Sequence, residues 1–187
     1  GRQGCALHDY ATGAEHSPVV PARDMPGPKS VGNGLTFPRD LTTLADARAG
    51  LVALSDEVAS RLRAHGLYAG AVQITVKDAG FKTITRQAQL ATPTHLAKDI
   101  AAAALTLLQQ NWRFPAPIRM LTVTALNVSH SAAAQLSLFA PEAGQEDVRR
   151  ESLEKSLDSI RGKFGKSAIA SASALRADMG LGGLKIK

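Results

Sequence analysis

Apolar and polar residues alternate most regularly between residues 71 and 90, AVQITVKDAGFKTITRQAQL, and this alternation predicts a β-hairpin. In the first strand the two kinds of residue take alternate positions: Val72, Ile74 and Val76 against Gln73, Thr75 and Lys77. Asp78, Ala79 and Gly80 supply the turn, in which Gly80 can adopt a positive φ. We therefore expect a hairpin with one buried face and one polar face.

The return strand continues the polar face with hydroxyls and amides, contributed by Thr83, Thr85, Gln87 and Gln89. Its other face holds Lys82, Ile84, Arg86, Ala88 and Leu90, so that Arg86 interrupts a largely apolar series. A polar sheet face is most often simply solvated, but hydroxyls, amides and lysines are also the groups that contact a phosphate backbone. If the strand bulges at Arg86, this side chain joins the polar face.

Helical periodicity predicts one helix before the hairpin and one after it. The first covers residues 44–65, with Thr43 as N-cap and Gly66 at its end. Its apolar stripe consists of Leu44, Leu51, Leu54, Val58 and Leu62. The second helix is expected to start near residues 92–94, Thr-Pro-Thr, and to end near Asn111.

Two further strands complete the pattern, at residues 35–42 and 118–128. Pro38 implies that the first of them lies at a sheet edge or contains a bulge. The resulting order, βαββαβ, predicts an α+β domain in which a four-stranded sheet carries both helices on one face. The polar face of the hairpin then belongs to the uncovered side of the sheet.

Segments of different character flank this domain. Residues 20–31 contain three prolines and read as a linker, and residues 147–161 show a further helical pattern. Between the domain and that helix, Leu138 and Phe139 end a small, polar arm. Such a pair either packs on the domain's own core or anchors the arm in a partner's hydrophobic groove.

Composition narrows the class of partner. The chain has 187 residues, 44% of them hydrophobic, which is enough for a packed core, and its formal net charge is +6. That charge favours an anionic partner such as nucleic acid, whereas an aromatic content of 4% argues against a platform that stacks single strands. No apolar run approaches the ~20 residues of a membrane span, so we expect no membrane partner. The single cysteine and the absence of a signal-like start suit a reducing cytosol.

Residues that could support catalysis do not cluster in the sequence. The five histidines have no metal-ligand spacing, and there is no Walker-type or dinucleotide-binding loop. No carboxylate pair lies on a core strand, where a two-metal site for phosphoryl transfer would need it. We therefore expect no catalytic residue, no metal ligand and no cofactor in this chain.

Several segments resemble the C-terminal part of Y-family, translesion DNA polymerases of the bacterial DNA polymerase IV type. Residues 29–33 (KSVGN) and 36–41 (TFPRDL) resemble the "KSIG…TFPRDL" start of that family's little-finger domain. Residues 135–139 (QLSLF) resemble its sliding-clamp-binding peptide, and residues 72–86 its DNA-facing hairpin. There are departures: Thr122 stands where the family usually has glycine, Lys77 stands where arginine is common, and the hairpin tip is Asp78-Ala79-Gly80.

The resemblance implies a division into five parts. Residues 1–20 would end a thumb domain, 21–33 form a linker and 34–130 form the DNA-binding little finger. Residues 131–144 would be a clamp-binding arm and 145–187 a helical C-terminal tail. The full-length protein would be a cytoplasmic, bacterial DNA-directed DNA polymerase that copies damaged DNA. Mg²⁺ is implied for that enzyme but not for this chain, which lacks the catalytic palm and should be inactive alone.

The resemblance also implies two partners, a template-primer duplex and the sliding clamp, or beta ring. The implied DNA-binding residues are Lys29, Ser30, Thr36, Arg39, Lys77, Lys82, Thr83, Thr85, Arg86 and Gln87. The implied clamp-binding residues are Gln135, Leu136, Ser137, Leu138 and Phe139. Two alternatives stay open: a non-catalytic relative that acts as a clamp- and DNA-binding adaptor in mutagenic repair, and a ferredoxin-like RNA-binding domain. The RNA-binding alternative lacks the pair of exposed aromatics that stacks bases.

Overall fold

The computed structural model describes residues 2–21, 24, 27–130, 145–165 and 168–169. Its helices and strands are α1 (Arg2–Thr12), β1 (Ser30–Leu41), α2 (Leu44–Ala64), β2 (Ala69–Asp78), β3 (Thr83–Thr94), α3 (Ala97–Asn111), β4 (Ile118–Leu126) and α4 (Gln145–Phe164). Within the described residues, no helix combines the length and the hydropathy needed to cross a membrane.

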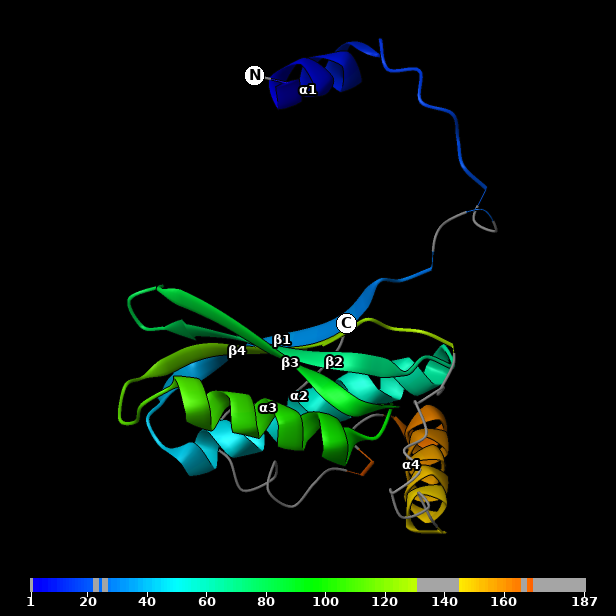
Figure 1. Cartoon of the computed structure of the whole chain (residues 1–187). Coiled ribbons are helices and arrows are strands. Elements are labelled where there is room, and N and C mark those ends of the chain that lie inside the picture. The colour runs from blue at the N-terminus through cyan, green and yellow to red at the C-terminus, as the bar shows by residue number, and fades with distance from the viewer. Residues whose placement is uncertain (1, 22–23, 25–26, 131–144, 166–167, 170–187) are drawn as a thin grey trace.

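The four strands form one antiparallel sheet in the order β1-β4-β2-β3. Helices α2 and α3 lie side by side on one face of it, and the other face carries no helix (Figure 1). This confirms the predicted α+β architecture, a βαββαβ domain with both helices on one side. We call the uncovered side the open face.

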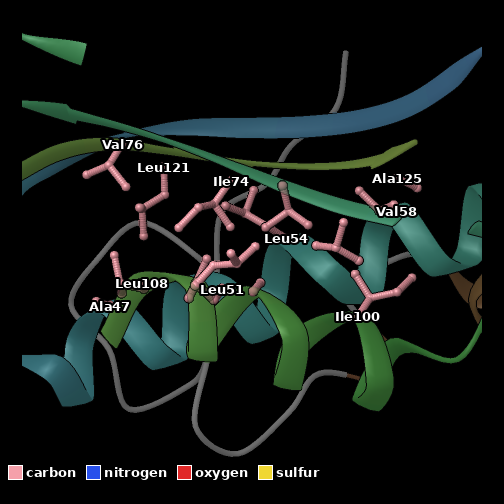
Figure 2. Close-up of a cluster of buried hydrophobic side chains, with 14 of the residues drawn as sticks. Ala47, Leu51, Leu54, Val58, Ile74, Val76, Ile100, Leu108, Leu121 and Ala125 are labelled. Atoms are coloured by element: carbon pink, nitrogen blue, oxygen red, sulfur yellow. The ribbon is translucent and has the colours of Figure 1, made fainter. Parts of the chain in front are cut away.

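The core lies between the helix layer and the sheet. Leu51, Leu54 and Val58 of α2 point towards Ile74 of β2 and Leu121 of β4, and all of them are buried (Figure 2). The predicted apolar stripe of α2 is therefore right except at its first residue, Leu44, which is 38% exposed. Leu44 directly follows the N-cap, and the stripe meets the sheet only further along the helix.

The caps of α2 follow the sequence prediction. Thr43 Oγ1 accepts a hydrogen bond from the backbone N–H of Asp46 at 3.1 Å, which satisfies one donor of the first turn. At the other end, Gly66 adopts a φ of +62°, a conformation that favours glycine after a helix. Both ends of α2 are thus set by local sequence.

The first strand starts earlier than the sequence predicts. β1 begins at Ser30, and residues 30–36 pair one by one with β4, starting with Ser30 opposite Leu126. Residues 30–33 are therefore strand, although their neighbouring prolines suggest a linker. Pro38 lies in an edge strand, where the register with β4 shifts between Thr36 and Leu41, as the sequence predicts.

The second helix starts later than predicted. β3 continues to Thr94, which pairs with Ala69, and α3 begins only at Ala97. The Thr94 hydroxyl donates to Asp99 at 2.9 Å and accepts from the N–H of Leu96 at 3.1 Å. Pairing with β2 keeps the Thr-Pro-Thr segment extended, and this outweighs its resemblance to a helix start.

Helix α4 docks against the corner where α2 ends and α3 begins, and it does so through charged groups. Arg63 of α2 donates to the carboxylates of Glu154 and Asp158 on α4, with Arg63 Nε 2.7 Å from Asp158 Oδ2. Its side chain is only 5% exposed. Glu154 Oε1 also accepts the Ala97 N–H at 3.0 Å, so α4 caps α3, whose own N-cap residue makes no side-chain cap bond.

The protonation of this corner follows from burial and from Arg63. Burial raises the pKa of Glu154 above its ordinary value, with Arg63 opposing the change. Burial would also raise the pKa of Asp158, but its bonds to Arg63 bring that pKa below the ordinary value. His95 is buried beside them, its ring stacked on Tyr68 at a centroid distance of 4.3 Å, and burial lowers its pKa.

Candidate nucleic-acid interface

The strand pairing arranges the open face into rows that cross all four strands. Residues directly opposite each other in a sheet share a face, so the registers define each row from β1 through β4 and β2 to β3. The rows are Thr36–Met120–Lys77–Thr83, Gly34–Thr122–Thr75–Thr85, Gly32–Thr124–Gln73–Gln87 and Ser30–Leu126–Ala71–Gln89. Hydroxyl and amide side chains dominate these rows.

Local sequence determines which side chains reach this face. Along β2, Ile74 and Val76 are buried under the helices, whereas Thr75 and Lys77 alternate with them on the open side. The hydroxyls of Thr75 and Thr85 lie 3.3 Å apart across the β2–β3 pair. β2 and β3 pair in register from Ala71 to Lys77. Backbone hydrogen bonds between the two strands therefore hold this polar surface in place.

The glycines of β1 leave space for threonines of β4. A Cβ at Gly34 would lie 2.5 Å from Thr122 Oγ1 and 3.3 Å from the Leu121 carbonyl oxygen. At Gly32 it would lie 2.8 Å from Thr124 Oγ1. Over β1 the open face therefore lacks the side chains that would stand above the backbone at Gly32 and Gly34. Thr122, which replaces the glycine usual in the resembled family, fits because Gly34 lies opposite it.

Replacing Gly34 by alanine should lower the free energy of unfolding by about 1–3 kcal/mol, since the new methyl group overlaps Thr122. Chemical denaturation of the two proteins measures this difference. The double variant G34A/T122A should recover most of the loss because it removes the overlapping hydroxyl. Gly162→Ala serves as the control, with no atom within 4 Å of the added Cβ, and a comparable loss there would contradict the explanation.

The charge of the open face is small and positive. Lys77 is the only charged residue in the rows, and the rows contain no carboxylate. Lys82 lies in the hairpin loop beside Thr83, and Lys29 directly precedes Ser30; both are exposed. Hydroxyls, amides and ammonium groups can all donate hydrogen bonds to phosphate oxygens without distinguishing bases. The arrangement thus suits a sequence-independent grip on a polyanion.

Arg86 does not join this surface, because the strand does not bulge there. It pairs in register with Ile74, whose side chain is buried under the helices, so Arg86 is on the helix side of the sheet. Its Nε donates to Asn111 Oδ1 at the end of α3, at 2.9 Å. The only register shift recorded in this strand pair lies between Ala69 and Ala71. Strict alternation therefore decides where Arg86 points.

Arg39 is also separated from the rows. It follows Pro38 in the irregular part of β1, and its Nη1 donates to Asp46 Oδ2 of α2 at 3.0 Å. The hydrogen bond and charge of Arg39 lower the pKa of Asp46 below the ordinary value. The structure therefore brings together Ser30, Thr36, Lys77, Thr83, Thr85 and Gln87, with Lys29 and Lys82 beside them, but neither of the two arginines.

Five polar side chains of the open face were not among the predicted DNA-binding residues: Gln73, Thr75, Gln89, Thr122 and Thr124. The signal for the first two was available, because they alternate with Ile74 and Val76 in the sequence. Thr122 and Thr124 needed the register of β4 between β1 and β2, which the sequence does not contain. The clamp-peptide residues 135–139 lie outside the described residues.

A family model described as the impB/mucB/samB family C-terminal domain matches residues 28–138. The chain is 33% identical over 183 residues to DNA polymerase IV of Clostridium kluyveri, a match that covers 94% of this chain and 45% of the relative. It is 36% identical over 186 residues to DNA polymerase IV of Acetivibrio thermocellus, covering 97% and 45%. The chain thus spans about half the length of the curated relatives it matches.

Two solved structures are similar in outline. A complex of the beta-clamp processivity factor and the little finger domain of PolIV matches 59% of this chain and 99% of the solved chain, with a TM-score of 0.46 and 19% identity. A Y-family DNA polymerase chimera, Dbh-Dpo4-Dbh, matches 70% of this chain and 36% of the solved chain, with a TM-score of 0.49 and 14% identity.

Proposed function

The chain belongs to the impB/mucB/samB family of C-terminal domains, and on that premise we propose that it binds DNA and a sliding clamp for a translesion polymerase. The whole protein would be a Y-family, DNA-directed DNA polymerase that copies damaged templates during DNA repair. Both relatives described above are named DNA polymerase IV, which favours an active polymerase over a non-catalytic adaptor. Since these relatives are bacterial, we place the protein in the bacterial cytoplasm.

One observation supports the DNA-binding role above the others, namely that the four rows of the open face are rich in donors and contain no carboxylate. A polymerase that copies damaged templates benefits from holding the duplex by its phosphates, because a polymerase that contacted the bases would reject distorted templates. We propose that Thr75, Thr83, Thr85 and Gln87 donate to phosphates, with Lys77 adding charge. Thr122 and Thr124 extend the same surface towards β1.

The resemblance implies Mg²⁺ for the full-length enzyme and not for this chain. Within the described residues, no group of three or more His, Cys, Asp or Glu side chains could hold a metal ion. We propose that this chain positions DNA for chemistry performed by the rest of the protein.

The salt dependence of duplex binding tests the DNA-binding role. With three lysines at the open face (Lys29, Lys77 and Lys82), log K against log[salt] should have a slope of about −3, from −0.9 per neutralised phosphate. Had Arg39 and Arg86 taken part as well, five charges would give a slope of about −4.5. Titrations of a labelled template-primer duplex at salt concentrations from about 50 to about 200 mM determine this slope.

Lys77→Ala should weaken duplex binding and reduce the slope by about one. Lys98→Ala is the matched control, because Lys98 is an exposed lysine on α3, in the helix layer. It should leave both affinity and slope unchanged. If the parent chain did not bind duplex at low salt, or if both variants behaved alike, the open face would not be the DNA-binding surface.

A further inference from the structure

An exposed aromatic side chain occupies the tip of the hairpin that borders the open face. Phe81 lies in the loop between β2 and β3, and 76% of it is exposed. Phe81 is not part of the hydrophobic core, so its side chain does not contribute to the packing of this domain. It is a surface feature that the proposed phosphate contacts do not use.

The backbone holds Phe81 in a conformation that a phenylalanine seldom adopts. The Asp78 N–H donates to the Lys82 carbonyl at 3.0 Å, and the Phe81 N–H donates to the Asp78 carbonyl at 3.1 Å. These bonds define a three-residue hairpin loop, Ala79 to Phe81, whose third residue takes a left-handed conformation. Phe81 accordingly has a φ of +65°.

The sequence prediction placed this positive φ on Gly80, and it was wrong by one residue. Glycine is the residue that occupies the left-handed position of such loops without strain. Here Gly80 comes one position too early and Phe81 takes the strained position. Asp78 Oδ1, which accepts the Lys82 N–H at 2.8 Å, helps to hold the loop in this form. A strained residue that persists in a fold is a reason to look for a role.

The position of the loop indicates what Phe81 meets. Figure 1 shows the tip of the β2–β3 hairpin projecting beyond the rest of the sheet and away from α2 and α3. The row next to the tip contains Lys77 and Thr83, and Lys82 follows Phe81 directly. An apolar ring is therefore presented at the border of a donor-rich surface, flanked by two positive charges.

We propose that Phe81 contacts the DNA duplex beside the phosphates held by the open face, with its ring against the deoxyribose of the backbone. Burial of the exposed ring against the sugars is favourable, because it removes apolar surface from water. The contact is apolar and has no hydrogen-bonding preference, so it is compatible with damaged templates. This inference rests on the proposed DNA-binding function and adds to it a residue that holds DNA without charge.

The experiment compares three forms of the full chain: the parent, Phe81→Asn and Phe81→Tyr. Asparagine tolerates a positive φ, so Phe81→Asn should raise the thermal midpoint by about 2–4 °C. The same variant should bind a labelled template-primer duplex about tenfold more weakly. The slope of log K against log[salt] should stay unchanged, because no charge is lost. Phe81→Tyr keeps the ring and should retain the parent affinity.

The proposal is supported if Phe81→Asn is more stable than the parent and binds DNA more weakly with an unchanged salt slope. An unchanged slope also distinguishes the role of Phe81 from that of Lys77, whose loss reduces the slope. Equal duplex affinity of the parent and Phe81→Asn would overturn it while leaving the DNA-binding function in place. Weaker binding of the sliding clamp by Phe81→Asn, with duplex affinity unchanged, would also overturn it and assign Phe81 to a protein contact. If the parent itself fails to bind duplex, both the proposed function and this inference are wrong.

Discussion

Replacing Arg63 by alanine should release α4 from the domain and lower the free energy of unfolding by about 3–5 kcal/mol, the usual result of removing one partner from a buried ion pair. Arg63 is nearly fully buried and donates to Glu154, Asp158 and the carbonyl of His95. Without it, the carboxylates of Glu154 and Asp158 lose the cation that they share. The cap that Glu154 provides for Ala97 is lost when α4 leaves.

Denaturant unfolding measures the stability, and hydrogen exchange of the α4 amides reports whether the helix is docked. Arg61→Ala is the matched control, on the same helix two residues away, because its side chain is 44% exposed and its ion pair with Glu57 is of the surface type. It should cost at most about 1 kcal/mol. The combined variant R63M/E154Q/D158L removes all three charges and should recover much of the stability. Equal losses for Arg63→Ala and Arg61→Ala would contradict this account of α4 docking.

Replacing Leu138 and Phe139 together by alanine should abolish binding to the sliding clamp and leave duplex affinity unchanged. In the proposed function these side chains fill a hydrophobic pocket on the ring, and a short peptide has few other contacts to compensate for their loss. The link to a ring on DNA would raise the local concentration of a weakly binding polymerase at the primer end. Loss of Leu138 and Phe139 should therefore prevent recruitment to the clamp without changing the affinity for duplex DNA.

Calorimetry with the isolated clamp and a duplex titration measure the two affinities separately. Lys77→Ala provides the reciprocal control, since it should weaken duplex binding and leave clamp binding intact. Both residues of the pair lie outside the described residues, so this prediction depends on the sequence motif QLSLF and not on a contact in the structure. Equal clamp affinity for the double variant and the parent would show that the motif is not the clamp-binding peptide.

Three features show how far local sequence reaches in this protein. The alternation in residues 71–90 correctly predicts a polar open face, and the helical period correctly predicts α2 under the sheet. The order of these elements is sufficient to predict the βαββαβ fold. Each of these depends on contacts close in the chain or on a repeat that one strand or helix carries by itself.

The structure differs from the sequence-based expectation at two places in the β2–β3 hairpin. The Thr-Pro-Thr segment has the composition of a helix start, but Thr94 pairs with Ala69 and remains strand. Arg86 looks like a DNA-contacting residue beside Thr85, but its partner across the sheet is Ile74 and its side chain meets Asn111. In both cases pairing between strands decides the outcome, because a one-residue change of register reverses every side chain.

The sequence by itself determined the elements, their order, the polarity of the open face and the family resemblance, because periodicity and short motifs are local properties. Only the tertiary structure decided which polar residues share a row, because the pairing of β4 with β1 joins residues far apart in the chain, such as Ser30 and Leu126. It likewise decided that Arg63 holds α4, through Glu154 and Asp158 at separations of 91 and 95 residues. Such pairings depend on how the whole chain packs, and no local pattern contains them.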